Sequence, residues 1–270
     1  MQPDKFVDID TKTATAARMY DYMLGGTDNY AVDRIAVNRV EDLLPGTKAM
    51  VRNNRRFLER AVRYLAEERG IRQFLDNGSG LPTRSNVHNI AQHVDRRSRV
   101  VYIDKDPVVL RHQKVNALAE NENTAFILAD ARDVDAILDH EETRRLLDFT
   151  EPVAVLYFAF LHFIPDEDEP LRIIARMMDR LVPGSFLALS HTVSDKAEIR
   201  ELGTELAMGN TKGRFGRIRE PREVLAFFDG LELVEPGLVD IRQWRPEGLD
   251  EEHADTWVLY GGVARKPGSH

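Results

Sequence analysis

The stretch that decides the fold is FLDNGSGLPT, residues 74–83, and the next apolar run ends in VVYIDKDP. A short strand enters a glycine turn, a helix follows, and a second strand ends on an acid, Asp104. Asp76, Gly78 and Gly80 form a D-x-G-x-G pattern at the end of the first strand. Glycines at such a position let the backbone turn tightly and approach a ligand closely. This order of elements is typical of an α/β domain that binds a nucleoside.

The residues after the second glycine disfavour a pyrophosphate ligand. In a dinucleotide site a third glycine follows the second by three positions, and a helix N-terminus faces the pyrophosphate. Here position 83 is Thr, and Pro82, which suits a first helical turn, removes a backbone donor that a phosphate would use. A glycine turn with a purely structural role is the alternative for this motif alone.

Further acids end the next two strands. Asp104 is placed to accept both hydrogens of a ribose diol, although it is also a candidate helix cap, a role for which Asp106 is better placed. Asp130 ends the third strand in LADARD, where it either caps a helix or accepts from an adenine amine while Ala131 donates from its backbone. With the acid of the glycine turn, three consecutive strands end on an acid, which favours one shared binding edge.

The length and composition favour some classes of protein and argue against others. With 270 residues, 43% of them hydrophobic and 30% charged, the chain fits one large α/β domain, or one domain plus a small cap. A net charge of −8 argues against general nucleic-acid binding, and the lack of cysteine excludes disulfides and thiolate metal sites. No run approaches the roughly 20 apolar residues that span a bilayer, and the N-terminus lacks a signal-peptide pattern. We therefore expect a cytoplasmic protein without membrane or metal binding.

Strand-like and helical segments alternate from residue 73 onward. Strands are expected at 73–77, 99–104, 125–130, 153–160 and 185–191, and helices at 108–118, 170–181, about 196–208 and 220–228. Nearly continuous apolar strands that alternate with helices indicate a parallel sheet buried on both faces. The last strands, within 231–244 and at 256–264, have too short a connection for a crossover helix and are predicted to be antiparallel. We divide the chain into a helical cap, residues 1–69, and a main domain, residues 70–270.

The cap contains the segment RMYDYMLGGTDNYAVDR, residues 18–34. Gly25 and Gly26 interrupt a helix, and Tyr20 is one of several polar and aromatic residues around the break. We interpret this segment as a lid over the strand ends that excludes water, although the glycines would also simply end a helix. The basic run RNNRRFLER, residues 52–60, is predicted to be a solvated helix face.

One further motif is LHFIPD, residues 161–166, which we call the lip. Through D-x-G-x-G, Asp104, LADARD and the lip, the chain resembles class I S-adenosylmethionine-dependent methyltransferases over about residues 70–264. The chain is also similar to one bacterial subfamily of them, through RxYDYxLGG, FLDNGSGLPT, VYIDKDPVVL, PGSFLALSH and FFDGLELVEPG. Asn77 departs from the pattern, because such turns usually carry an apolar residue there. The resemblance implies a Rossmann-like, mostly parallel seven-stranded sheet with an antiparallel last strand, plus an N-terminal helical cap.

The resemblance also implies that S-adenosylmethionine is the cofactor. Asp104 would hold its ribose hydroxyls, Asp130 its adenine amine, and the backbone near Phe158 would line the methyl-donor region. Arg52 or Asn53 is a candidate for binding its methionyl carboxylate. The expected cofactor-binding residues are Asp76, Gly78, Gly80, Asp104, Asp130, Ala131, Phe158, Tyr20, Gly25 and Gly26.

The catalytic residues are less well defined by the sequence. His162 and His191 are weak candidates for a general base, which is needed only if the acceptor must lose a proton, and each is alternatively a structural histidine. The acids at 166–169 are expected only to favour the first turn of the next helix, and segment 209–217 to contact substrate.

The leading functional hypothesis is a methyltransferase that acts on a small-molecule acceptor. The alternative is a regulatory protein that binds S-adenosylmethionine or S-adenosylhomocysteine without catalysis. A nicotinamide oxidoreductase is disfavoured by Thr83 and by the antiparallel close of the sheet.

Overall fold

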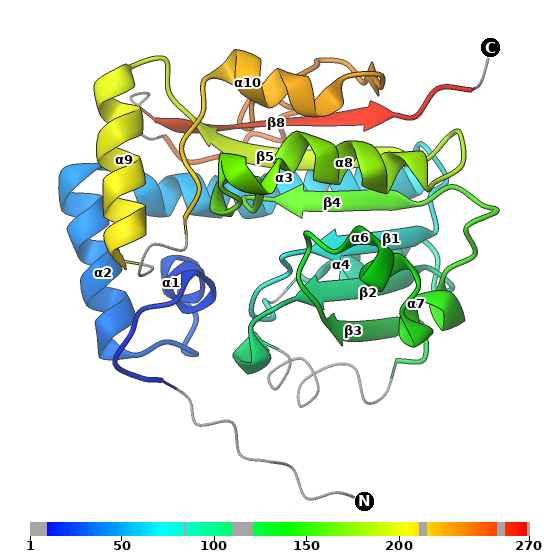
Figure 1. The fold of residues 1–270 in the computed structure, drawn as a ribbon, viewed down its shortest axis with the longest axis horizontal. Coiled ribbons are helices and arrows are strands. Elements are labelled where there is room, and N and C mark those ends of the chain that lie inside the picture. The colour runs from blue at the N-terminus through cyan, green and yellow to red at the C-terminus, as the bar shows by residue number, and fades with distance from the viewer. Residues whose placement is uncertain (1–9, 84, 110–120, 211–214, 253–256, 269–270) are drawn as a thin grey trace, which may run out of the picture.

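The computed structural model describes residues 10–83, 85–109, 121–210, 215–252 and 257–268 (Figure 1). Within them one eight-stranded sheet has the order β3-β2-β1-β4-β5-β8-β6, and β7 also pairs with β8. The strands are β1 (Gln73–Asn77), β2 (Arg99–Asp104), β3 (Thr124–Leu128), β4 (Ala154–Phe158), β5 (Phe186–Val193), β6 (Glu232–Leu233), β7 (Val239–Asp240) and β8 (Val258–Arg265). Strands β1 to β5 are parallel and β8 runs antiparallel to β5. The predicted Rossmann-like, mostly parallel sheet with an antiparallel end is therefore confirmed.

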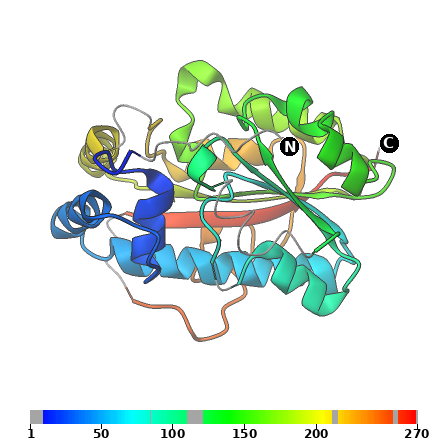
Figure 2. The same cartoon turned by 90° about the horizontal axis from the view of Figure 1, so that it is seen from below.

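Helices cover both faces of the sheet and one of its ends. The described helices are α1 (Ala16–Met23), α2 (Ala31–Leu43), α3 (Thr47–Glu67), α4 (Val87–Val94), α6 (Val134–Leu138), α7 (Glu141–Leu146), α8 (Pro170–Asp179), α9 (Ala197–Asn210) and α10 (Pro221–Leu225), with short 3₁₀ turns η1 (Leu161–Phe163), η2 (Asp166–Asp168) and η3 (Ala226–Phe228). Figure 2 shows α3 and α4 on one face and α6 to α8 on the other. Helices α1, α2 and α9 lie beyond the carboxyl ends of the parallel strands (Figure 1).

The core has two layers because successive strand residues point to opposite faces. Phe74 packs in the layer under α3, whereas its neighbour Leu75 packs in the layer under α8. Phe57 of α3 is fully buried, and its ring meets that of Phe158 on β4 at 5.3 Å. Part of the predicted cap, residues 1–69, therefore belongs to the core of the sheet, while α1 and α2 lie at the strand ends.

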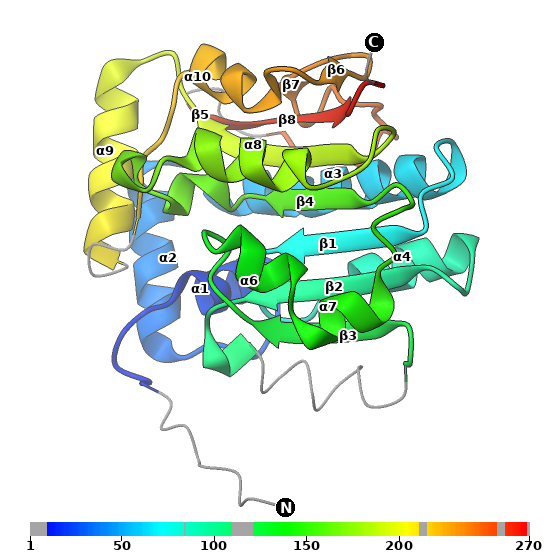
Figure 3. The same cartoon turned by 45° about the vertical axis from the view of Figure 1, so that its right-hand side comes forward.

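The antiparallel edge is more divided than expected. Strands β6 and β7 are two residues long and each pairs with β8, at different points (Figure 3). The helix predicted at 108–118 lies almost wholly outside the described residues.

The register brings the predicted site residues to one edge. Asp76 is aligned with Tyr102 on β2 and Leu156 on β4, and Asp104 with Leu128 on β3. Because these strands are parallel, the acids that follow them lie along the same carboxyl edge, as the sequence indicates.

Candidate active site at the carboxyl edge of the sheet

The glycine turn after β1 is held against β2. Gly78 and Gly80 have φ values of 70° and 64°, in the left-handed region that glycine adopts without strain. The Gly78 amide donates to Ile103 O at 2.8 Å, and the Gly80 amide donates to Asp104 Oδ2 at 2.9 Å. A Cβ at Gly78 would overlap the Phe160 ring, whereas one at Gly80 would meet no atom within 4 Å. The turn thus leaves open space beside Gly80.

The helix after this turn begins later than predicted. Helix α4 starts at Val87, and Asn86 is its N-cap. The Thr83 amide donates to Asn86 Oδ1 at 2.9 Å. Pro82 therefore lies in a loop, and its placement in a first helical turn was wrong.

Two carboxyl groups lie beside the turn in low-polarity surroundings. Burial raises the pKa of Asp76 to about 7, against the opposing charge of Arg55 and with a further increase from Asp104. Burial also raises the pKa of Asp104, although the amides of Asp106 and Gly80 donate to its oxygens and act the other way. Both carboxylates would be stabilised by hydrogen-bond donors or a positive charge from a ligand.

Asp130 differs from Asp76 and Asp104 because its carboxylate already forms ion pairs within the protein. Arg132 donates to both of its oxygens, at 2.9 and 2.6 Å, and Lys105 lies 3.7 Å away. Partial burial opposes ionisation of Asp130, but these hydrogen bonds and the charges of Arg132 and Lys105 outweigh it and lower the pKa. An adenine amine at Asp130 would share this carboxylate with Arg132. Ala131, the next residue, is buried.

The methyl-donor region predicted near Phe158 lies at the end of β4, where Phe158 itself is buried. The next residue, Ala159, has a positive φ of 49°, which is unusual for a residue with a side chain. Its amide donates to Ser190 Oγ at 2.8 Å. The ends of β4 and β5 are therefore linked at the point where the backbone turns away from the sheet.

Helix α3 contributes two residues that were not predicted from the sequence, Asn54 and Arg55. Asn54 contacts both Tyr20 of α1 and Ser190 of β5, and the charge of Arg55 acts on both Asp76 and Tyr20. A signal for Asn54 was present, because it lies three and four residues before Phe57 and Leu58 and so on the apolar side of the helix. A polar residue on a buried helix face needs a partner.

The interpretation of residues 52–60 as a solvated face was wrong. Asn53, Asn54 and Arg60 are buried. Arg52 forms an ion pair with Glu251 at 2.6 Å, and Asn53 exchanges two hydrogen bonds with the Glu251 backbone, at 2.7 and 2.8 Å. These two candidates for carboxylate binding therefore hold the loop that contains Glu251. The arginine whose charge acts on Asp76 of the glycine turn is Arg55.

The N-terminal segment is organised by a buried ion pair. Arg18 Nε lies 2.9 Å from Asp33 Oδ2, and their side chains are 2% and 0% exposed. Asp33 also accepts from the amides of Thr15 and Tyr30. The pair thus ties the start of α1 to the start of α2.

The glycine pair ends α1 between these anchors. Gly25 has a φ of 79°, and a Cβ at Gly26 would overlap the Asp21 carboxylate. Asn29 donates to Asp21 Oδ2 and to Gly26 O, both at 2.9 Å. The segment is therefore a closed turn beside the strand ends, and Tyr20 is its link to α3.

The two candidate histidines have different surroundings. Both ring nitrogens of His191 are engaged: Nδ1 donates to Thr192 O, and Arg219 donates to Nε2, each at 2.8 Å. Burial, His162 and Arg219 lower the pKa of His191 well below its ordinary value. Nδ1 of His162 is buried and has no hydrogen-bond partner among the described residues, and burial followed by Arg219 lowers its pKa to about 3. Both imidazoles are neutral at physiological pH.

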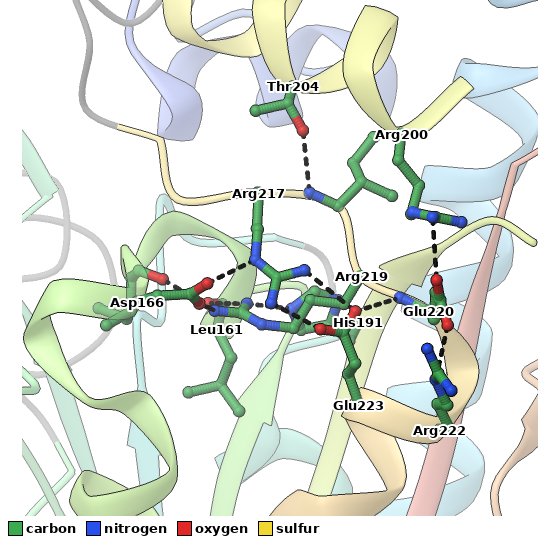
Figure 4. Close-up of polar contacts among 12 residues, drawn as sticks. Leu161, Asp166, His191, Arg200, Thr204, Arg217, Arg219, Glu220, Arg222 and Glu223 are labelled. Carbon is green, nitrogen blue, oxygen red and sulfur yellow. Dashed lines mark hydrogen bonds and ion pairs between the residues drawn. The ribbon is translucent and has the colours of Figure 1, made fainter. Parts of the chain in front are cut away.

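Arg219 connects His191 to the lip after β4 (Figure 4). Its guanidinium donates to Leu161 O and Ile164 O at 3.3 Å and to Asp166 Oδ1 at 2.6 Å. Arg217 also binds Asp166, and it pairs with Glu223 of α10 at 2.7 Å. The lip is thereby fixed to the segment that leads into α10.

The acids at 166–169 were assigned too narrow a role. The first three form the 3₁₀ turn η2, and Glu169 is the N-cap of α8, which begins at Pro170. Asp166 binds two arginines and Asp168 binds Arg132 at 2.6 Å. Of the segment 209–217, residues 211–214 lie outside the described residues.

The described residues were also compared with what a metal site or a membrane-spanning helix requires. It contains no group of His, Asp and Glu side chains suited to hold a metal ion. None of its helices has the length and apolarity needed to cross a membrane.

Comparisons with known proteins agree with this geometry. A family model described as S-adenosyl methyltransferase matches residues 3–267. The chain is 41% identical to a DUF574 family protein from Streptomyces avermitilis, covering 96% of this chain and 100% of that one at a TM-score of 0.87. It is 38% identical to a proposed methyltransferase from Thermobifida fusca, covering 96% and 97% at a TM-score of 0.88.

A more distant structure shares the fold alone. It is an N-methyltransferase from Bradyrhizobium japonicum in complex with S-adenosylhomocysteine, 14% identical, covering 93% of this chain and 99% of that one at a TM-score of 0.50. No curated protein matches the chain. The glycine turn, the acids along one sheet edge and a family match over nearly the whole length lead to one conclusion: the chain belongs to the S-adenosyl methyltransferase family, and its cofactor is S-adenosylmethionine.

Proposed function

We propose that the enzyme transfers the methyl group of S-adenosylmethionine to a small-molecule acceptor at the carboxyl edge of the sheet. The observation that carries the proposal is the turn at Gly78–Gly80, where space opens beside Gly80 and Asp104 lies within one hydrogen bond of that glycine. The net charge of −8 argues against a nucleic-acid acceptor.

The residues present fit this cofactor. Asp104 has oxygens for the ribose hydroxyls, and Asp76 provides a carboxyl group for the methionyl ammonium. Arg55 provides a positive charge for the methionyl carboxylate, and its buried Nε has no partner among the described residues. Asp130 and Ala131 are proposed to hold the adenine, and Phe158 to line the methyl-donor region. Tyr20 closes the methionyl end from α1, and Gly25 and Gly26 shape the turn that follows it.

When bound, the sulfonium supplies an electrophilic methyl group, and the protein's task is to bring a nucleophile into line with it. Positioning accounts for most of the rate of such a displacement. His191 lacks a free nitrogen, so His162 is the remaining candidate base, with a low pKa that makes it a weak one. We therefore propose that orientation and exclusion of water contribute more than proton removal.

We propose that the acceptor binds against an aromatic wall at the lip, formed by the side chains of His162, Phe163 and Phe215. The rings of His162 and Phe163 lie 4.7 Å apart, and Phe215 lies 5.1 Å from Phe163. This wall is apolar, which suits a small organic acceptor.

Substitution of Asp104 tests the cofactor site. We expect Asp104→Ala to weaken S-adenosylhomocysteine binding at least about a hundredfold, because it removes two hydrogen bonds to a charged group, each contributing about 1.5–3 kcal/mol. Calorimetry on folded protein gives the affinity, and Asp133→Ala, which removes only the N-cap of α6, is the control. Equal affinity of wild type and Asp104→Ala would contradict the assignment. Formation of S-adenosylhomocysteine in a screen of small acceptors then tests the reaction itself.

A further inference from the structure

A chain of hydrogen bonds runs from the end of β4 to α1. The Ala159 amide donates to Ser190 Oγ at 2.8 Å, and Ser190 Oγ lies 2.6 Å from Asn54 Oδ1. Asn54 Nδ2 lies 2.8 Å from Tyr20 Oη. Ser190 is fully buried and Asn54 is 1% exposed, so water does not compete for these groups.

The direction of this chain is set by its first member. An amide N–H only donates, so Ser190 Oγ accepts from Ala159 and its own proton goes to Asn54 Oδ1, the one acceptor that the described residues offer it. The 2.6 Å separation is typical of an O–H···O bond. If the amide were flipped, the Ser190 proton would be buried without an acceptor, which is costly. Asn54 therefore presents its NH₂ group to Tyr20.

This arrangement leaves the Tyr20 proton available. Tyr20 Oη accepts from Asn54, and its own contact with Val51 O, at 3.5 Å, is at the limit of a hydrogen bond. Asp76 and Arg55 are both close enough for their charges to act on the phenol. The buried Nε of Arg55 is a second donor without a partner among the described residues.

We propose that Ser190 and Asn54 are positioning residues that fix the Tyr20 hydroxyl as a donor, and that Tyr20 and Arg55 together bind the carboxylate of the cofactor's methionyl group. The inference rests on the proposed function, because it places S-adenosylmethionine at this edge. Tyr20 and Arg55 provide the donors for a carboxylate, and Asp76 provides an acceptor for an ammonium group. Together they match the two charges of an α-amino acid.

The test compares two ligands that differ at this point. S-adenosylhomocysteine carries the amino acid group, whereas 5′-methylthioadenosine has the same adenosine and thioether without it. We expect Tyr20→Phe to weaken S-adenosylhomocysteine binding about tenfold in calorimetry and to change methylthioadenosine binding less than twofold. Tyr22→Phe, on the same helix with its ring against Lys48, should change neither affinity.

Ser190 tests the positioning role without touching the ligand. Ser190→Ala should weaken S-adenosylhomocysteine binding by about threefold and leave methylthioadenosine unchanged, while Ser190→Thr, which keeps the hydroxyl, restores the affinity. The Ala159 amide stays paired in Ser190→Ala, because it also donates to Ser190 O at 3.1 Å.

The binding affinities of these variants distinguish a role in carboxylate binding from a role in packing. Equal losses for both ligands would indicate a packing role and overturn the proposal, as would unchanged S-adenosylhomocysteine binding in Tyr20→Phe or failure of Ser190→Thr to restore it. If wild type binds neither ligand, the proposed function fails and the inference fails with it. Binding of both ligands with a selective loss in Tyr20→Phe supports the inference.

Discussion

Asp76, the acid of the glycine turn, makes the stability of the protein depend on pH. Asp76 is 6% exposed, and burial raises its pKa to about 7, above the ordinary 3.8. The folded state therefore prefers the protonated acid. The stabilisation from this group is complete below pH 3.8 and is lost as the pH rises towards 7.

Asp76→Asn tests this residue, because an amide cannot ionise. We expect the free energy of unfolding of the variant, minus that of wild type, to increase between pH 5 and pH 7.5, by at most about 1.4 kcal/mol per pH unit. Urea denaturation of the ligand-free proteins at both pH values measures it. Asp95→Asn is the control, because hydrogen bonds from Arg97 lower the pKa of Asp95 and keep it ionised throughout this range. A difference that does not change with pH would contradict the assignment.

At the scale of elements, the position of α1 depends on the buried pair of Arg18 and Asp33. Removing one partner leaves the other charge buried, which costs about 3–5 kcal/mol. We expect Asp33→Ala to increase amide hydrogen exchange at least tenfold in α1 and to leave β1 and β4 unchanged. Exchange measured by mass spectrometry reports both regions. Arg34→Ala, which removes only an exposed contact with Asn29, should leave α1 protected; a loss of protection there would contradict this role of the buried pair.

The lip after β4 is a second such element, and Arg219 makes three of the hydrogen bonds that hold it. The Arg219 side chain is 3% exposed, and its charge adds to burial in lowering the pKa of His162 and of His191. We expect Arg219→Met to raise the pKa of both histidines, as seen by NMR titration of their ring protons. Arg222, 82% exposed, provides the control: Arg222→Met should leave both values unchanged. Unchanged histidine titrations in Arg219→Met would contradict a contribution of Arg219 to either pKa.

For the whole molecule, α3 joins α1 and the segment after β7 to the sheet. Arg60 donates to Trp244 O at 3.0 Å and to Ile241 O at 2.6 Å, and the Trp244 ring meets Phe57 at 5.4 Å and Tyr64 at 5.7 Å. The segment after β7 is therefore part of the main core. Loss of the core at Trp244 should destabilise the protein as one unit.

Trp244→Ala tests whether the segment after β7 unfolds together with the rest of the protein. Truncation of a fully buried Trp costs about 3–5 kcal/mol, which in a chain of this size lowers Tm by about 10 °C. We expect a single calorimetric transition at the lower temperature. Leu249→Ala, at a side chain 66% exposed, should shift Tm by less than about 2 °C. Two separate transitions in Trp244→Ala would show that the C-terminal segment unfolds on its own.

The sequence predicted the sheet well because its signals are local. Apolar runs, glycines and strand-terminal acids repeat in a fixed order, and parallel pairing brings strand ends to one edge wherever the helices lie. The pattern at Asp76, Gly78 and Gly80 and the acid Asp104 indicated the cofactor for the same reason. The antiparallel end was likewise predicted from the short connection before the last strand.

Contacts between distant segments were the part that the sequence did not reveal. Asn54 and Arg55 come from a basic run that reads as a surface helix. In the fold α3 packs against the sheet, so that Asn54 contacts Ser190 on β5 and the charge of Arg55 acts on Asp76. Asp166 reads as a helix-terminal acid until Arg217 and Arg219, some fifty residues later, lie against it.

By itself, the sequence determined the fold class and the methyl donor, because both depend on residues close together in the chain. Only the tertiary structure decided which polar side chains are paired and which remain for a ligand. A buried polar group takes whichever partner the folded chain brings within about 3 Å, and for Asn54 that partner is a serine on β5.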